Sequence, residues 1–472
     1  MNNRAAKSGV AVASGVCFLL LGVGIALQAQ TATDPGLRPP PIDAGNFVSG
    51  LTSQQMGMLP DFTNAFNRVV AVPNVPGTPN PNSVPPVFGG LGPVFNSNSC
   101  VSCHSQPAAG GSSPGPGGFG STTNPLFSVY QLDGAVNTMP AFITTTGPVL
   151  VPRFPYMSDL VTPDGQVHQL FTIQGRKDAS GCVLAQPNFV QAASQNNLVF
   201  RQPIPLYGDG WIDLVQDSSI YANMNANLTL KQQLGITGHP NIIVNDGSIS
   251  HFGWKAQIKS LKEMVALEQQ VEKGVSNVFF PNEQNETPGC VLNAVPEDGD
   301  YYAVGQSIVD PTRDQFTGDA QRATLFVRFL DQPTPAVLLG TTNGQTQFNN
   351  VGCVLCHNQT FVTPLGSIMN NNVSVNLFSD LLVHHMGACL ADNIVQGSAQ
   401  GDEFRTAPLW GAGQRIFFLH DGRTSNIVTA IEDHFCNASG VYGPSEANAV
   451  ITAFNGLTPG NQQDLISFLR NL

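Results

Sequence analysis

The pentapeptides Cys-Val-Ser-Cys-His at residues 100–104 and Cys-Val-Leu-Cys-His at residues 353–357 decide most of what this chain can be. Both follow the pattern C-x-x-C-H, in which two thiols add to the vinyl groups of a haem and the next histidine coordinates its iron. Two copies predict two covalently bound haem c groups. The predicted attachment residues are Cys100, Cys103 and His104 for the first, and Cys353, Cys356 and His357 for the second.

Three other interpretations of the motifs are a zinc site, a dithiol redox pair and structural disulfides. A zinc ribbon brings its two C-x-x-C knuckles within a few tens of residues, whereas these motifs are about 250 residues apart. A thioredoxin-like motif opens a helix after a βαβ strand, and no such strand precedes either motif. Haem attachment therefore remains the favoured interpretation.

Composition narrows the class of protein around these motifs. The 472 residues include 42% hydrophobic residues, which is enough to build cores, and 48 Gly and 35 Pro, which favour long loops. Only 11% of the residues are charged, and the net charge is −12. Without a basic cluster to offset phosphate repulsion, no nucleic-acid partner is expected.

The first 29 residues have the pattern of a secretory signal peptide. Arg4 and Lys7 precede an apolar run over residues 10–27, and cleavage is plausible after Ala29. We therefore expect export to the periplasm, which also suits haem attachment. The alternative is an uncleaved membrane anchor, because 18 apolar residues can just span a bilayer.

The rest of the chain predicts a mainly α fold with long loops, arranged as two cytochrome c-like haem domains. Residues 30–86 form a Pro/Asn-rich arm or linker, residues 87–335 an N-terminal haem domain with an insertion, and residues 336–472 a C-terminal haem domain. Apolar periodicity predicts helices over residues 255–274, 319–329, 424–435 and 462–469, a helical patch at 59–70, and a short strand at 241–244.

Four segments resemble the di-haem oxidoreductase, putative peroxidase family, which is related to the bacterial di-haem cytochrome c peroxidases. They are LGPVFNSNSCVSCH (91–104), FGWKA (252–256), HMGACLAD (385–392) and FRTAPLWGAGQRIFFLHDGRTSNIVTAIEDH (404–434). The resemblance implies a peroxidase-like oxidoreductase. Electrons would enter the second haem from a small cytochrome c or cupredoxin and reduce hydrogen peroxide, or another small substrate, at the first haem.

The resemblance also implies a sixth ligand for the second haem. In the relatives an H-D-G motif is followed fourteen residues later by this ligand, commonly Met; here the motif starts at His420 and His434 stands at that spacing. His357 and His434 would then form a six-coordinate, bis-His centre of lowered potential. Met386 is the alternative ligand.

In the relatives a distal histidine often follows the first motif by some sixteen residues, whereas this chain has Gly120 there and no histidine between residues 105 and 167. The resemblance therefore implies that the first haem keeps an open position. His168, Met139 or Lys255 could still close it.

The resemblance gives Trp254 the role of an electron relay between the haems and Glu272 that of the catalytic acid/base, while Met264 stands where the relatives have Gln. Trp254 could instead be plain core, and Glu272 an exposed helix residue. Arg415 and Phe417 occupy the positions of two residues that help to hold calcium in the peroxidases, which puts a calcium ion in doubt.

Four cysteines remain after Cys17 in the apolar run and the four haem cysteines are set aside. In an exported chain they suggest two disulfides, with three possible connectivities. Keeping each pair within one domain favours Cys182–Cys290 and Cys389–Cys436, and free thiols are the alternative.

The expected function is thus a periplasmic di-haem c-type cytochrome oxidoreductase of peroxidase type. The alternatives are a non-enzymatic di-haem electron-transfer cytochrome, or an oxidase that acts on a sulfur or organic substrate.

Overall fold

The computed structural model describes residues 31–70, 91–120, 122–130, 138–173, 183–242, 246–284, 298, 318–364 and 372–472. The residues from Ala32 to Leu472 form one compact unit. The predicted signal peptide, Cys182 and Cys290 lie outside the described residues. In the described part of the chain, no helix is both long and apolar enough to cross a membrane.

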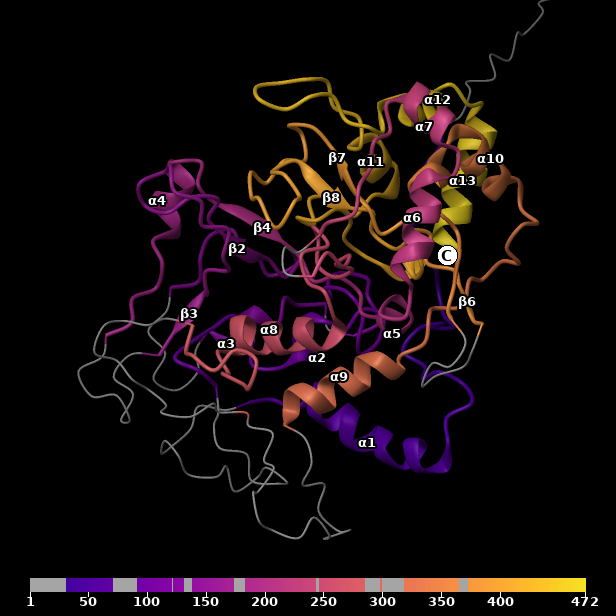
Figure 1. Cartoon of the computed structure of the whole chain (residues 1–472). Helices are drawn as coiled ribbons and strands as arrows, with labels where there is room; N and C mark the ends of the chain where they lie inside the picture. The colour runs from indigo at the N-terminus through magenta and orange to yellow at the C-terminus, as the bar shows by residue number, and fades with distance from the viewer. Residues whose placement is uncertain are drawn as a thin grey trace, which may run out of the picture. The chain divides into compact units, whose positions relative to one another are not determined.

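Helices dominate the regular structure of the described residues, so the expectation of a mainly α fold is confirmed (Figure 1). The α-helices are α1 (Ser53–Asn67), α2 (Cys100–Cys103), α3 (Leu126–Val129), α4 (Phe189–Ser194), α5 (Asp209–Ile212), α6 (Asp217–Asn225), α7 (Leu228–Leu234), α8 (Leu261–Lys273), α9 (Asp319–Phe329), α10 (Asn343–Val351), α11 (Ile427–Glu432), α12 (Asn448–Asn455) and α13 (Pro459–Arg470). Two 3-10 helices, η1 (Cys353–Leu355) and η2 (Ala412–Gln414), complete the set.

The strands are short and pair only in twos. The antiparallel pairs are β1 (Val94–Phe95) with β3 (Phe171–Thr172), β2 (Val151–Arg153) with β4 (Val199–Arg201), β5 (Phe361–Val362) with β6 (Ser374–Val375), and β7 (Val383–His385) with β8 (Glu403–Arg405). Such small ladders do not build a core; they fix loops against one another.

The predicted helices are present, but their ends differ from the expectation. Helix α9 has the predicted bounds, and α13 begins three residues early because Thr458 caps it and Pro459 suits its first turn. Helix α8 begins six residues late, after Ser260, whose side chain accepts a hydrogen bond from Glu263 N. The residues before it instead form a tight loop, in which Phe252 bridges Ile258.

Helices α1 and α11 also begin away from their expected positions. Helix α1 starts at Ser53, because Thr52 and Gln55 form a capping box, and not at residue 59. Helix α11 starts after Asn426, whose side chain caps it, and therefore begins three residues later than the predicted start at residue 424. Of the predicted strand at 241–244, Ile242 makes a single bridge to Ile249, and the last two residues lie outside the described part.

Two hydrophobic clusters lie beside the two motifs, and the first of them also includes side chains from beyond residue 336, such as Phe361 and Trp410. The first joins α1, α5, α8 and α9, with Phe66 stacked on Phe326 at 4.4 Å between ring centroids. The second joins α10, α12 and α13 around Phe348, Phe454 and Phe468, and these helices lie together in Figure 1. Each cluster also includes side chains from one C-x-x-C-H motif, so each motif is anchored on a hydrophobic core.

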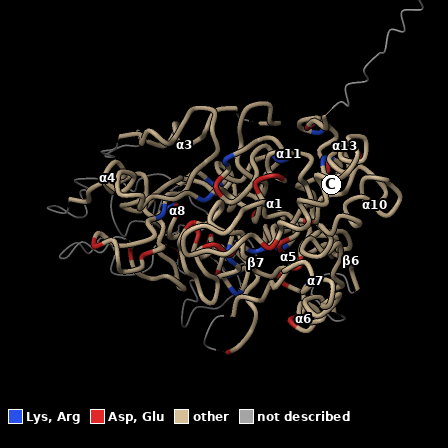
Figure 2. Tube along the Cα trace, turned by 90° about the horizontal axis from the view of Figure 1, so that it is seen from above, with Lys and Arg blue, Asp and Glu red and all other residues tan. Residues whose placement is uncertain are grey.

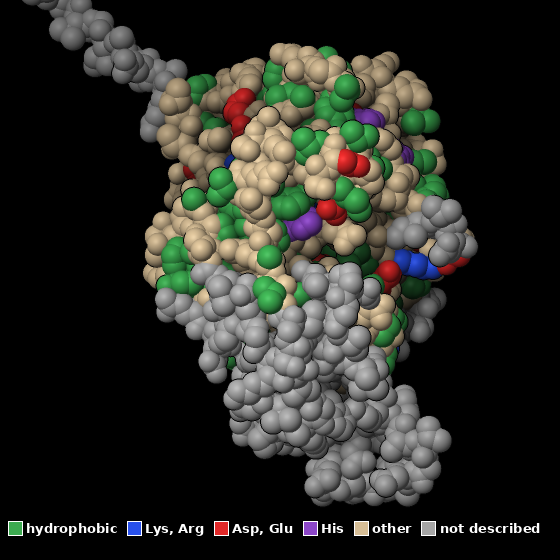
Figure 3. Space-filling view, turned by 90° about the vertical axis from the view of Figure 1, so that its left-hand side faces the viewer, with side chains coloured by type: hydrophobic (Ala, Val, Ile, Leu, Met, Phe, Trp, Pro, Cys, Tyr) green, Lys and Arg blue, Asp and Glu red, His purple; other side chains and the backbone are tan. Residues whose placement is uncertain are grey.

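Charged residues are sparse along the trace (Figure 2) and on the face of the molecule drawn in Figure 3, where hydrophobic side chains are scattered among polar ones. Several of the charges are instead buried in ion pairs. Asp34 and Arg470, for example, lie 436 residues apart in sequence, and their Oδ2 and Nη2 atoms are 2.6 Å apart. This pair ties the described start of the chain to its last helix.

Candidate functional site

Each of the two C-x-x-C-H motifs lines a cavity of its own. The first cavity, of about 140 Å³, is lined by Cys100, Cys103 and His104 among others. The second cavity, of about 210 Å³, is lined by Cys353, Cys356 and His357 among others. All six predicted attachment residues thus line a cavity, three in each.

Both motifs fold locally in the same way. Each forms a single helical turn, α2 in the first and η1 in the second, so that cysteines three residues apart lie on one face. The backbone N–H of the histidine then donates to the carbonyl of the first cysteine, at 3.0 Å for His104 and 2.8 Å for His357. This turn directs two thiols and one imidazole toward the same space.

The histidine rings are oriented by their Nδ1 atoms. Nδ1 of His104 is 3.0 Å from Gly111 O, and Nδ1 of His357 is 2.9 Å from Phe378 O, so each ring donates to a backbone carbonyl. The ring of His104 also has a hydrogen bond to the backbone of Ile204. Metal-binding histidines are commonly fixed in this manner. Burial lowers the pKa of both rings to about 4, which keeps them neutral, as an iron ligand must be.

The four motif cysteines are free thiols in the structure, so neither motif forms an internal disulfide. Burial raises the pKa of Cys103 and of Cys353 to about 12. Protonated thiols at these two positions do not resemble the thiolates of a reactive dithiol. In the second motif, Cys356 Sγ lies 3.8 Å from Nδ1 of His384. The donor set of each cavity therefore fits a haem held by two thioether bonds and one imidazole.

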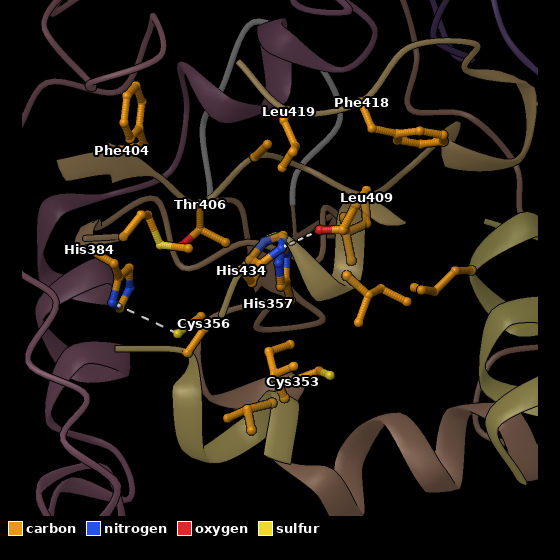
Figure 4. Close-up of a pocket in the computed structure, with 18 of the residues that line it drawn as sticks. Cys353, Cys356, His357, His384, Phe404, Thr406, Leu409, Phe418, Leu419 and His434 are labelled. Carbon is orange, nitrogen blue, oxygen red and sulfur yellow. Dashed lines mark hydrogen bonds between the residues drawn. The ribbon is translucent and has the colours of Figure 1, made fainter. Parts of the chain in front are cut away.

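The second cavity also receives His434, the predicted sixth ligand (Figure 4). Its Nδ1 is 2.6 Å from the carbonyl oxygen of Ala430, which lies one helical turn earlier, in α11. This hydrogen bond orients the ring through Nδ1, as in the two motif histidines. Met386, the alternative ligand, lines the cavity as well. The structure thus brings both candidates to the second cavity, with the imidazole of His434 fixed by a hydrogen bond.

A disulfide connects the chain segments that carry these two candidates. Cys389 and Cys436 are bonded, as the sequence predicted, and they follow Met386 by three residues and His434 by two. The link holds the loop after β7 against the end of α11. The other predicted pair, Cys182–Cys290, falls outside the described residues.

Acidic side chains from α8 enter the first cavity. Glu272 lines it, with Oε2 accepting a hydrogen bond from Asn96 Nδ2 at 2.9 Å. Burial and the nearby Glu268 raise the pKa of Glu272, so the alternative of an exposed helix residue does not describe its environment. Met264 also lines this cavity.

Glu268 is a cavity residue that the sequence interpretation missed. It precedes Glu272 by four residues on α8 and therefore lies on the same helix face. Its side chain is exposed along the cavity and not packed in a core. Desolvation by the surrounding protein raises its pKa, while the guanidinium of Arg153 opposes that rise. The i, i+4 spacing of the two acids was the only signal in the sequence that could have suggested a pair.

The three residues expected as possible closing ligands of the first haem lie elsewhere. His168, Met139 and Lys255 do not line the first cavity. The ring of His168 stacks on Phe154 at 3.8 Å, and Lys255 Nζ pairs with Asp392 Oδ1 at 3.1 Å. Among the described residues that line the first cavity, His104 is the only histidine.

Trp254 lines both cavities, and its surroundings form the wall between them. Its indole Nε1 donates to Gln202 O at 2.9 Å, and its carbonyl accepts from Arg405 N at 2.8 Å. On the side of the second cavity, the ring of His420 lies edge-on to Trp254 at 6.3 Å and stacks on Phe404 at 4.2 Å. The indole is therefore part of the wall and not of either hydrophobic core.

One protein-family model matches the chain. Its description is "Di-haem oxidoreductase, putative peroxidase", and the match covers residues 169–472. This range includes Trp254, Glu272, the second motif and His434, whereas the first motif precedes it. No curated protein gives a significant match to the chain.

Proposed function

The chain belongs to the di-haem oxidoreductase family, and on that premise we propose that it is a periplasmic c-type cytochrome that reduces hydrogen peroxide. The observation that carries the proposal is that Trp254 lines both cavities, while His434 reaches only the second. One cavity can thus hold a six-coordinate iron and the other an iron with an open position, with an aromatic side chain between them.

The residues of the second cavity are suited to store and pass on electrons. His357 and His434 present free Nε2 atoms from two different segments, η1 with its following loop and the end of α11. Both imidazoles would hold the iron of a haem in this cavity, which would exclude substrate from it. When bound, the two haem groups supply the redox chemistry and the iron to which peroxide binds.

In the first cavity, the acids of α8 would move the protons. Reduction of hydrogen peroxide to two molecules of water consumes two electrons and two protons. Glu268 would take the proton from one peroxide oxygen and return it to the other, which then leaves as water. Glu272, whose raised pKa favours its protonated form near neutral pH, would supply further protons through the same helix face.

We propose a small cytochrome c or cupredoxin as the electron donor. The net charge of −12 favours a basic partner surface. The signal-like N-terminus would place the protein in the periplasm, where such donors occur, with a membrane association only if that segment is not cleaved. Trp254 would carry electrons from the second cavity to the first.

A spectroscopic titration tests the proposal. The purified protein is expected to carry two covalent haems by mass, and one of them is expected to show a high-spin signal in the half-reduced state that changes on addition of peroxide. A protein without covalent haem would refute the cytochrome assignment. Low-spin spectra in every redox state, unchanged by peroxide, would refute the peroxidase assignment.

A non-enzymatic electron-transfer cytochrome is the second candidate. Met264 and Lys273 both line the first cavity and offer a thioether and an amine that could bind its iron. In that case both haems would be low-spin in every redox state. The same titration therefore separates the two functions.

A further inference from the structure

Two arginines line the second cavity without an ionic partner of their own. Arg405, in β8, is 4% exposed, and Arg415, just after η2, is 8% exposed. The Nε atom of each is buried and has no hydrogen-bond partner in the described part of the chain. A buried donor without an acceptor is unusual in a folded protein and calls for an explanation.

The contacts that these guanidinium groups do make are with uncharged carbonyls. Arg405 Nη1 donates to His251 O at 2.6 Å, and Arg415 Nη2 donates to Pro408 O at 3.2 Å. Such bonds satisfy single N–H groups but leave the positive charge uncompensated. Neighbouring buried arginines differ in this respect: Arg201 pairs with Asp392 and Arg470 with Asp34, both at 2.6 Å.

No described carboxylate compensates Arg415. The charge that acts on it most is Arg470, which is also positive, and together with burial it lowers the pKa of Arg415 to about 10. Arg405 has Asp209 nearby, but burial raises the pKa of Asp209 to about 7, so this acid is only partly ionised near neutral pH. A buried charge without a counter-ion is strongly unfavourable. An anion bound in the cavity would supply the missing negative charge.

We propose that Arg415 binds a propionate carboxylate of the haem in the second cavity and that Arg405 assists with the other propionate. This inference rests on the proposed presence of a haem c in that cavity. A haem brings two carboxylates, and guanidinium groups bind carboxylates through paired N–H donors. Arg415 would then be a cofactor-binding residue, and its fixed charge would raise the potential of a centre that two imidazoles tend to lower.

The test compares three variants of the full-length holoprotein. Arg415→Met removes the charge but keeps an unbranched side chain, and Arg415→Lys keeps the charge without the paired donors. Arg423→Met is the control, because Arg423 is 37% exposed, pairs with Asp421 and does not line the cavity. The measurements are the reduction potential of the bis-His haem and its propionate-bending bands in resonance Raman spectra.

We expect a shift of the potential to more negative values in Arg415→Met, because the reduced haem loses the stabilisation that a nearby cation gives it. Arg415→Lys should recover most of that shift but move the propionate bands, and Arg423→Met should change neither quantity. If Arg415→Met does not fold, the bands of Arg415→Lys decide the question alone.

An unchanged potential in a haem-loaded Arg415→Met protein, or unmoved bands in Arg415→Lys, would overturn the inference. A wild-type potential that depends on chloride concentration at constant ionic strength would also overturn it, since a free anion would then occupy the site. These outcomes differ from failure of the proposed function, which would be seen as absence of covalent haem at Cys353 and Cys356 in the wild-type protein.

Discussion

At the scale of single residues, three imidazoles share one geometry. His104, His357 and His434 each have Nδ1 within hydrogen-bond distance of a backbone carbonyl, and each residue lines a cavity. Such a bond fixes both tautomer and ring angle before a metal arrives. The ring of His434 is therefore oriented for coordination to the same degree as the rings of the motif histidines. The carbonyl that fixes it belongs to Ala430, which lies one helical turn before His434.

Replacement of His434 tests this preparation. In His434→Ala the second haem is expected to lose its low-spin spectrum and to regain it when free imidazole is added. His168→Ala is the control, because His168 lines neither cavity and should leave the spectrum unaltered. A low-spin spectrum in His434→Ala, with the absorption of a thioether ligand, would assign the sixth position to Met386.

Replacement of Glu268 tests the proton chemistry of the first cavity. Glu268→Gln keeps the size of the side chain but removes its proton exchange, so peroxide reduction should slow by about 10²–10⁴-fold. Stopped-flow kinetics with the reduced protein would measure this. Glu263→Gln, on the same helix but outside both cavities, should react at the wild-type rate; a Glu268→Gln protein that also does so would exclude Glu268 as acid/base.

How much of this site the sequence predicts depends on how local each signal is. The six motif residues were predictable because attachment, ligation and helical turn all lie within five consecutive positions. Glu268 was not, because an acid on a helix face is ordinarily solvated and only the cavity makes it functional. The sequence also left His168 open as a residue that could close the first haem, because no local pattern reveals that its ring stacks on Phe154.

At the scale of elements, the Cys389–Cys436 disulfide joins the loop after β7 to the end of α11. The bond closes a loop of 47 residues, for which chain entropy alone predicts a stabilisation of about 4 kcal/mol. The Cys389→Ser, Cys436→Ser double variant should lose up to this free energy of unfolding in urea titrations. It should also show a larger high-spin fraction, because His434 lies two residues from the bond.

The wild-type protein treated with reductant should show the same loss of unfolding free energy and the same larger high-spin fraction as the double variant. If the double variant were as stable as the oxidised wild type and equally low-spin, the disulfide would have no part in positioning His434.

Helix α8 ends at a glycine that no other residue can replace without cost. Gly274 has φ +65°, and a Cβ there would lie 2.2 Å from Val94 O. Gly235 ends α7 with φ +75° but has open space around it. Gly235→Ala should therefore lose only about 1 kcal/mol of stability, and Gly274→Ala clearly more; equal losses in thermal unfolding would mean that the close approach to β1 is not needed.

Element boundaries show why helix prediction was accurate in the middle and not at the ends. The apolar spacing in α8 and α13 survives in the structure, and α8 ends at Lys273, one residue before the end of the predicted range. The start of α8 was wrong because residues 252–258 are held by a bridge and by contacts across the wall. Side-chain caps such as Asn426 depend on a rotamer and not on periodicity, so apolar spacing does not reveal them.

At the scale of the whole unit, the ion pair between Asp34 and Arg470 joins segments from opposite ends of the described chain. Burial alone would raise the pKa of Asp34, but Arg470 and the N–H groups of Ile427 and Gly36 lower it below 3.8. A lowered carboxylate pKa adds stability that is complete above the unfolded value and is lost as pH falls through the folded value.

Asp34→Asn should therefore be less stable than the wild type by about 1–3 kcal/mol at pH 7, and the two proteins should converge as pH falls below about 3.8. Urea unfolding across this range would measure the difference. Asp246→Asn is the control, since Asp246 pairs with Lys259 on the exposed surface and its loss should matter little. A difference that persists at low pH would show that the charge of Asp34 is not responsible.

The wall around Trp254 limits how this protein could be recombined with others. Trp254 Nε1 donates to Gln202 O, Arg405 N donates to Trp254 O, and Gln202 N donates to His420 O. These hydrogen bonds join the chain segments around residues 202, 254, 405 and 420. A chimera that exchanged the segment after residue 336 for that of a relative would replace one partner in two of these hydrogen bonds, because Arg405 and His420 lie in that segment while Trp254 and Gln202 do not. The wall between its two cavities would then combine segments from different parents, unless the residues around 202 and 254 were exchanged together with that segment.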